Sequence, residues 1–244
     1  MIFDRNAFRI FPLLLMALLL TSVAWAHPHH SHEDDNDHDH DHTHSHDEPM
    51  MVDDYHQLPA RPFQMIRGLP LNPEFYQPEV AELVEAGIPE KYGAEEWTAI
   101  IFTNELHQHI GIYNIVGAKM GVFARELLRA PTRAIHVDIE TGPHPPLSCT
   151  IDGIQWSLGS TYGQALIDAP ETDAPRVAAT FTHEDDTLHL ALKPEFQARI
   201  GTIIQEAIEE HGNLTPAYFD EIEAASYTIW REFDRKEIFE VSWR

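Results

Sequence analysis

Residues 133–140 have the sequence RAIHVDIE, in which apolar and polar side chains alternate. Because a β-strand places successive side chains on opposite faces, this stretch is predicted to be a strand that is buried on one side. Its buried face is formed by Ile135, Val137 and Ile139. On the polar face, His136 is expected to be an ordinary strand histidine with its hydrogen bonds satisfied.

The stretch before this strand has helical spacing. From about Thr103 to Arg129, apolar side chains recur at steps of three and four residues, which predicts one helix with a single buried stripe. Gly117 and Gly121 leave one side of that helix without side chains, which indicates close packing against a neighbouring element. The stripe consists of Tyr113, Val116, Met120, Phe123 and Leu127.

After the strand, a proline-rich loop from Thr141 to Leu147 leads to another predicted helix. Ser148 is a suitable N-cap, and the helix is expected to extend to about Leu158. Cys149 would then lie in its first turn.

The remaining segments mix helix and strand signals. Residues 78–87 predict a short helix, 176–182 and 187–192 a hairpin, 194–210 and 216–234 two helices, and 237–241 a last strand. The predicted fold class is therefore α+β, a single domain with an antiparallel or mixed sheet packed against helices.

Two segments that lie outside this fold are expected at the N-terminus. Residues 1–26 combine two arginines, an apolar run too short to cross a bilayer, and Ala24-Trp25-Ala26, as is typical of a signal peptide cleaved after Ala26. Residues 27–56 form a His/Asp-rich segment that is expected to be disordered, because it has little apolar surface to bury. Residues 57–100 are expected to be an irregular lead-in with a short helix, and residues 101–244 the main domain. The expected location is the periplasm or the cell exterior, without a membrane anchor after cleavage.

Histidines dominate the second segment, and imidazole suits borderline ions such as zinc, nickel and copper. We expect a metal-binding segment in which different sets of histidines can hold an ion. Its affinity for metal should fall towards about pH 5, as protons compete for imidazole. The alternative is a mere solubilising spacer. The candidate ligands are His27, His29, His30, His32, His38, His40, His42, His44 and His46.

The charge of the chain excludes some partners. Its formal net charge is −24 at pH 7, which argues against nucleic acid and against an anionic membrane surface. The expected partners are metal ions, together with a metal transporter or a metalloprotein that receives the metal. A homodimer is left open.

Cys149 is the only cysteine of the chain, so no intramolecular disulfide can form. A thiol in the first turn of a helix lies near unpaired amides, which favour the thiolate and make Cys149 a candidate zinc ligand. Asp152 lies three residues later on the same helical face. It is a candidate ligand, a candidate partner for a ligating histidine, or simply an acidic residue in a first turn.

His107 and His109 are the other candidate ligands in the domain. On a regular helix, side chains two residues apart point about 200° away from each other, so these imidazoles can share an ion only where the backbone is not helical. His144, five residues before Cys149, is an additional candidate.

Around these residues the chain resembles the FmdE-like domain family, which is named after a formylmethanofuran dehydrogenase. Residues 107–111, HQHIG, and 117–121, GAKMG, are similar to the family's His-Gly-His segment and the glycine-containing helix after it. Residues 146–155, PLSCTIDGIQ, resemble its Pro-Cys-x-x-Asp-Gly-Ile-Gln run, and residues 159–163, GSTYG, its Gly-x-Thr-x-Gly run. The resemblance extends over roughly residues 102–241.

The resemblance implies an α+β domain with a His/Cys metal site, zinc being the usual metal, and no settled activity. This chain departs from the family pattern at three points. Gln108 replaces a glycine. Gln164 stands where a lysine often follows the Gly-x-Thr-x-Gly run. The family's cysteine-rich C-terminal ribbon is missing. The last departure removes a second zinc site.

Two functions remain open. One is an exported metal-binding protein for storage, sensing or delivery, with a His-rich tail and a folded site formed by His107, His109 and Cys149. The alternative is a zinc-dependent enzyme of unknown substrate, in which an open metal position holds water and Asp152 is the general base. The chain has no phosphate loop, nucleophile elbow or metalloprotease helix motif, which favours binding over catalysis. Oxidation of formylmethanofuran itself is not expected.

Overall fold

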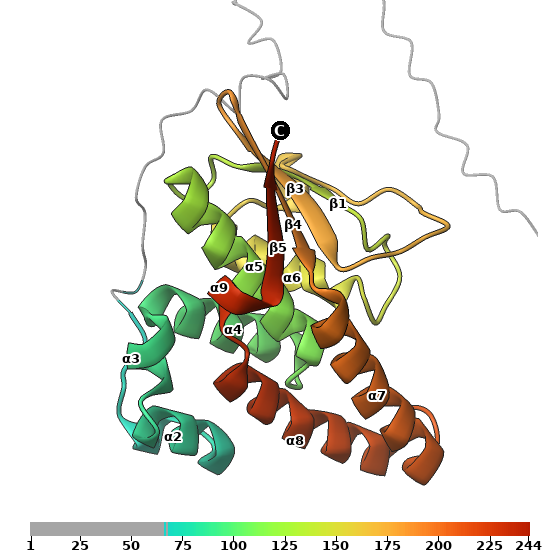
Figure 1. Cartoon of the computed structure of the whole chain (residues 1–244). Coiled ribbons are helices and arrows are strands. Elements are labelled where there is room, and N and C mark those ends of the chain that lie inside the picture. The colour runs from blue at the N-terminus through green and yellow to red at the C-terminus, as the bar shows by residue number, and fades with distance from the viewer. Residues whose placement is uncertain (1–65, 67) are drawn as a thin grey trace, which may run out of the picture. The chain divides into compact units, whose positions relative to one another are not determined.

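The structure is a computed structural model that describes residues 66 and 68–244. The predicted signal peptide and the His/Asp-rich segment lie outside the described residues. Within them, eight α-helices and five strands form an α+β domain, as predicted (Figure 1). None of the described helices is long and apolar enough to cross a membrane.

The helices and strands follow one another along the chain as shown in Figure 1. The N-terminal part contains the 3-10 helix η1 (Pro73–Phe75), then α2 (Pro78–Glu85), α3 (Ile88–Tyr92) and α4 (Ala94–His107). The middle part contains α5 (Ile112–Leu128), β1 (His136–Ile139), α6 (Cys149–Leu158), the 3-10 helix η2 (Tyr162–Gln164) and β2 (Ile167–Asp168). The C-terminal part contains β3 (Ala178–His183), β4 (Asp186–Leu192), α7 (Pro194–His211), α8 (Pro216–Glu232), α9 (Arg235–Ile238) and β5 (Phe239–Trp243).

The five strands form one mixed sheet in the order β2-β1-β3-β4-β5. β1 and β2 are parallel, whereas the other pairs are antiparallel. Val137 in β1, Phe181 in β3 and Leu188 in β4 are register partners across the sheet and are completely buried. This confirms the predicted buried face of β1. Helix α5 covers that face, and its Phe123 stacks with Phe239 of β5 at a centroid distance of 6.4 Å.

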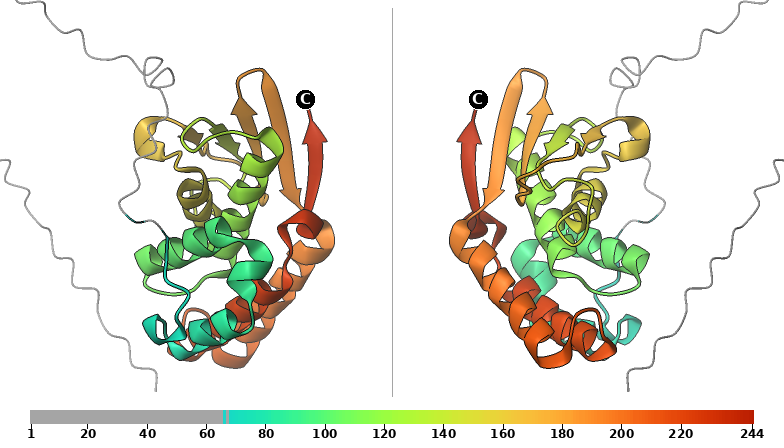
Figure 2. Two further views of the ribbon diagram at one scale, coloured as in Figure 1. Left: turned by 90° about the vertical axis from the view of Figure 1, so that its left-hand side faces the viewer. Right: turned by 90° about the vertical axis from the view of Figure 1, so that its right-hand side faces the viewer.

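The N-terminal lead-in is more helical than expected, because α3 and α4 follow the predicted α2. Trp97 and Ile100 of α4 belong to the same hydrophobic core as α5 and the sheet. In Figure 2, the antiparallel pair α7 and α8 lies at the end of the domain opposite the turn of the β3–β4 hairpin.

The long helix expected from Thr103 to Arg129 is instead two helices. α4 ends at His107, Gln108 adopts a left-handed conformation with φ 59°, and α5 begins at Ile112. Both helices bury apolar side chains in one core. Apolar spacing therefore continues across the break, and spacing alone could not reveal it.

Helices α5 and α6 approach each other most closely at their glycines. A Cβ atom at Gly117 would lie closer than 3.0 Å to backbone atoms of Thr150. A Cβ atom at Gly153 would similarly overlap backbone atoms of Asn114 and Ala118. The predicted close packing is thus confirmed, and it fixes α6 relative to the α4–α5 break.

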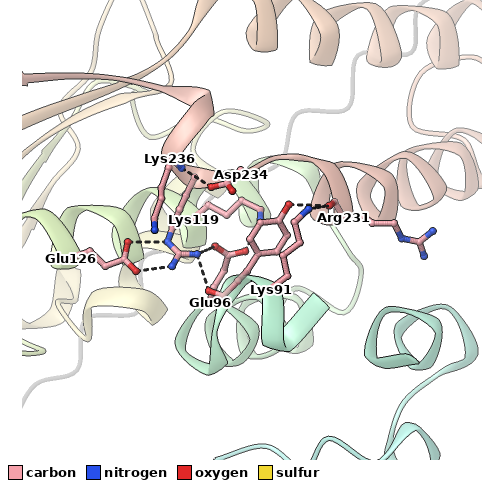
Figure 3. Close-up of polar contacts among 9 residues, drawn as sticks. Lys91, Glu96, Lys119, Glu126, Arg231, Asp234 and Lys236 are labelled. Atoms are coloured by element: carbon pink, nitrogen blue, oxygen red, sulfur yellow. Dashed lines mark hydrogen bonds and ion pairs between the residues drawn. The ribbon is translucent and has the colours of Figure 1, made fainter. Parts of the chain in front are cut away.

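A charged network centred on buried side chains joins α4 and α5 to the C-terminal segment (Figure 3). The Nζ atom of Lys119, which is completely buried, donates to Glu96 Oε1 at 2.5 Å, and Arg235 Nη1 donates to Glu96 Oε2 at 2.9 Å. Arg235 also pairs with Glu126 at 2.6 Å. Burial lowers the pKa of Lys119, whereas the Glu96 carboxylate acts to raise it. Because α9 carries Arg235 and leads directly into β5, the network ties the last strand to α4 and α5.

Candidate metal centre

The break between α4 and α5 carries both histidines that the sequence singled out. His107 is the last residue of α4, and His109 lies in the loop after it. The two side chains therefore do not have to point away from each other, as they would on a regular helix. Their ring centroids are 5.5 Å apart. Two imidazoles that share a tetrahedral zinc ion, with a Zn–N distance of about 2.1 Å, have ring centres about 5 Å apart. The spacing of His107 and His109 is therefore compatible with one shared ion.

In each imidazole ring, one nitrogen lies within hydrogen-bonding distance of an oxygen atom. His107 Nε2 lies 2.8 Å from Asp152 Oδ2 of α6, and His109 Nδ1 lies 3.0 Å from the carbonyl oxygen of His107. Among the described residues, the other nitrogens, His107 Nδ1 and His109 Nε2, have no hydrogen-bond partner. A histidine that ligates a metal typically has its second nitrogen held by a carboxylate or a carbonyl in this way. The arrangement therefore leaves one ligating nitrogen on each ring.

Asn104 of α4 fixes the loop that carries these histidines. Its Oδ1 atom accepts from the Gly111 amide at 2.9 Å and from Asn114 Nδ2 at 3.2 Å. Its own Nδ2 atom donates to the Ile100 carbonyl at 2.7 Å. Gln108, where the resemblance leads us to expect glycine, takes the left-handed conformation, which glycine adopts readily and other residues at a cost of about 1–2 kcal/mol. The chain therefore turns at the histidines with glutamine in that position.

Cys149 is the first residue of α6 and is partly buried. Burial raises the pKa of the Cys149 thiol, and the Asp152 carboxylate raises it further. A backbone hydrogen bond at the start of the helix acts to lower the pKa of the Cys149 thiol, as expected, but these larger effects outweigh it. The expected N-cap is also absent, because the Ser148 side chain makes no capping hydrogen bond. The raised pKa favours the neutral thiol, and a nearby cation such as a metal ion would favour the thiolate.

His107 lies beside His109 and Asp152, but the four predicted residues do not form a ready-made ligand set. In the part of the chain that the structure describes, only one group of His, Cys, Asp and Glu places three ligand atoms within 4.8 Å of one another, and it lies elsewhere. An ion shared by His107, His109 and Cys149 would require their side chains to turn toward it.

That other group consists of His136 and Asp138 on β1 and Asp168 on β2. His136 Nε2 lies 3.1 Å from Asp168 Oδ2, and its Nδ1 atom lies 3.9 Å from Asp138 Oδ2. Asp138 and Asp168 are direct partners in the parallel ladder, and facing like charges favour a cation between them. The domain therefore carries a His/Asp group that could hold a metal ion.

This His/Asp group was not predicted from the sequence. The alternation of residues 133–140 did place His136 and Asp138 on one face. Nothing in the sequence brought Asp168 to them, because β2 has only two residues and pairs across 30 positions of chain.

His144 lies apart from these pairings. The Nε2 atom of its exposed side chain lies 3.1 Å from Glu171 Oε1. The candidate ligands between His27 and His46 lie outside the described residues, so the structure places none of them.

Comparison with known families gives one match. The model of a family described as "FmdE, Molybdenum formylmethanofuran dehydrogenase operon" matches residues 106–237. The matched region includes His107, His109, Cys149 and Asp152. No curated protein matches the chain.

Proposed function

The chain belongs to the FmdE family, and from this premise we propose that it is an exported metal-binding protein whose folded domain holds one divalent ion. His107, His109 and Cys149 are the proposed ligands. Zinc is the proposed metal, with nickel or copper as alternatives. The His-rich segment gathers metal, and the folded site serves its storage, sensing or delivery.

The observation that carries this proposal is the pairing of both imidazoles with oxygen atoms. Asp152 fixes the orientation of the His107 ring, and the His107 carbonyl fixes that of the His109 ring, as the partners of a ligating histidine do. Phe219 of α8 lies edge-on to His109 at a centroid distance of 6.0 Å. An apolar side chain at this position limits the access of water to a bound ion.

The alternative, a zinc enzyme with Asp152 as general base, has less support. Asp152 Oδ2 is engaged by His107, and Oδ1 accepts from Gln155 Nε2 at 3.4 Å. Both oxygens therefore already have partners, and a base must be free to take a proton from water. The contacts of Asp152 favour a role in orienting His107.

Equilibrium dialysis of the full-length chain against zinc tests the proposal. His107→Ala and Cys149→Ser should each lose one ion per chain relative to wild type. His144→Ala is the matched control outside the site and should lose none. The histidines of residues 27–46 are the same in every variant, so differences report the folded domain alone.

Two outcomes would refute this assignment. If His136→Ala rather than His107→Ala loses the ion, the metal belongs to the β1–β2 group. If none of these variants differs from wild type, the folded domain holds no ion, and the His-rich segment is the only metal-binding part.

A further inference from the structure

A cavity of about 840 Å³ lies between α4 and α6. Its walls come from both helices, from the segments around Arg133 and Thr161, and from Arg125 of α5. The volume lies within the range of about 300–1,000 Å³ that is typical of small-molecule sites. The proposed metal site does not use it.

One wall of the cavity is flat and apolar. Phe102 of α4 and Trp156 of α6 stack with centroids 4.8 Å apart and an interplanar angle of 12°. Three large apolar side chains that remain exposed, Ile66, Leu106 and Trp156, all line this cavity. Exposed apolar side chains that gather at one hollow indicate a binding surface.

The charge of the lining is positive, although the whole chain is strongly negative. Two arginines and one glutamate line the cavity, whereas the net charge of the whole chain is −24. Arg125 is neutralised by Glu95 at 3.0 Å. Arg133 forms no ion pair with any described residue, and it faces only the amide oxygen of Gln164, in the amide orientation that satisfies both groups. Arg133 is therefore the cation that can receive an anion.

The backbone at Arg133 is held in an unfavourable conformation. Its φ angle is 66°, in the left-handed region. Its amide donates to the Leu158 carbonyl at 2.9 Å, which holds this conformation against the end of α6. Strain of this kind tends to be kept where it positions a functional side chain.

From these observations we infer that the cavity between α4 and α6 binds a small planar organic anion, such as an aromatic carboxylate. The ring packs against the Phe102–Trp156 pair, and the carboxylate pairs with Arg133. Gln155 lines the same cavity and also donates to Asp152. A bound ligand would therefore lie beside a residue that contacts the partner of His107.

Isothermal titration calorimetry of the full-length chain with 1-naphthoate tests this inference. The titration is made at about pH 8, above the ordinary histidine pKa of about 6.5. Naphthoate should bind once per chain, and Arg133→Gln should weaken its affinity by about tenfold, because a charge-assisted hydrogen bond is lost. Arg129→Gln is the matched control, since Arg129 is also exposed and left-handed (φ 53°) but does not line the cavity. It should leave the affinity unchanged.

The uncharged probe 1-naphthalenemethanol separates the two contributions. It should bind more weakly than naphthoate and be insensitive to Arg133→Gln. Trp156→Ala should weaken the binding of both probes, whereas Trp243→Ala, at an exposed tryptophan outside the cavity, should weaken neither. Unchanged unfolding midpoints for Arg133→Gln and Trp156→Ala would show that the variants remain folded.

Three results would overturn the inference. They are no binding of naphthoate, equal losses of affinity in Arg133→Gln and Arg129→Gln, and equal binding of the charged and uncharged probes. Because neither arginine nor tryptophan is a proposed metal ligand, the zinc content of these variants reports separately on the proposed function.

Discussion

Replacing Gly153 with alanine should destabilise the domain, although alanine is the better helix former. Gly153 lies inside α6 and faces α5. An added Cβ atom would lie closer than 3.0 Å to backbone atoms of Asn114, Gly117 and Ala118. Backbone atoms of a helix cannot rotate away as a flexible side chain can, so α5 and α6 would have to move apart.

The two opposing effects can be weighed. Overpacking a tight contact costs about 1–3 kcal/mol, occasionally more, and a three-fold overlap with backbone should reach the upper end. The higher helix propensity of alanine returns about 1 kcal/mol. We therefore expect Gly153→Ala to lower the free energy of unfolding by about 2 kcal/mol. Gly201→Ala is the matched control, because Gly201 lies inside α7 with nothing within 4 Å of its Cβ position. It should stabilise the domain by about 0.5–1 kcal/mol.

Urea unfolding of the full-length chain, followed by circular dichroism, measures both changes. The packing explanation is refuted if Gly153→Ala and Gly201→Ala change the free energy of unfolding in the same direction. It is also refuted if Gly153→Ala stays within about 0.5 kcal/mol of wild type, the usual range for a surface substitution.

Two further predictions concern helix capping and pH. Thr215→Ala should lower the free energy of unfolding in urea by about 1 kcal/mol, because the Thr215 side chain accepts from the Tyr218 amide at the start of α8. Ser148→Ala should lower it little, because the Ser148 side chain makes no such hydrogen bond. Burial acts to raise the pKa of Glu140, but hydrogen bonds from Arg176 and His189 prevail and lower it below the ordinary value of 4.5. A lowered carboxylate pKa stabilises the folded state above 4.5, and this contribution is lost as the pH falls through the lowered value. Glu140→Gln should therefore cost about 1 kcal/mol at neutral pH, and unfolding at decreasing pH should show that cost shrinking; a cost that grows in acid would contradict this.

The elements that the sequence predicted correctly are those with local causes. Alternation in residues 133–140 predicted β1, and the helix predicted over residues 216–234 is α8. The helix break at Gln108 could not be predicted from local patterns, because it does not interrupt the spacing of apolar side chains. The parallel pairing of Asp168 with β1 joins distant parts of the chain, and no local pattern records it.

The candidate site shows the same division. The residue types His107, His109, Cys149 and Asp152 were visible in the sequence, and the bond between His107 and Asp152 agrees with the role of histidine partner considered for Asp152. The raised pKa of Cys149 was not predictable, because it depends mainly on how deeply tertiary packing buries the thiol.

The absorption spectrum of the full-length chain loaded with cobalt(II) in place of zinc tests the proposed metal site most directly. A cobalt–thiolate bond gives a charge-transfer band in the near ultraviolet, and Cys149 is the only cysteine, so the His-rich segment cannot contribute to it. We predict this band in the wild type, its loss in Cys149→Ser and in His107→Ala, and its retention in His136→Ala. Absence of the band in the cobalt-loaded wild type, or its persistence in His107→Ala, would contradict a folded site built from these histidines and Cys149.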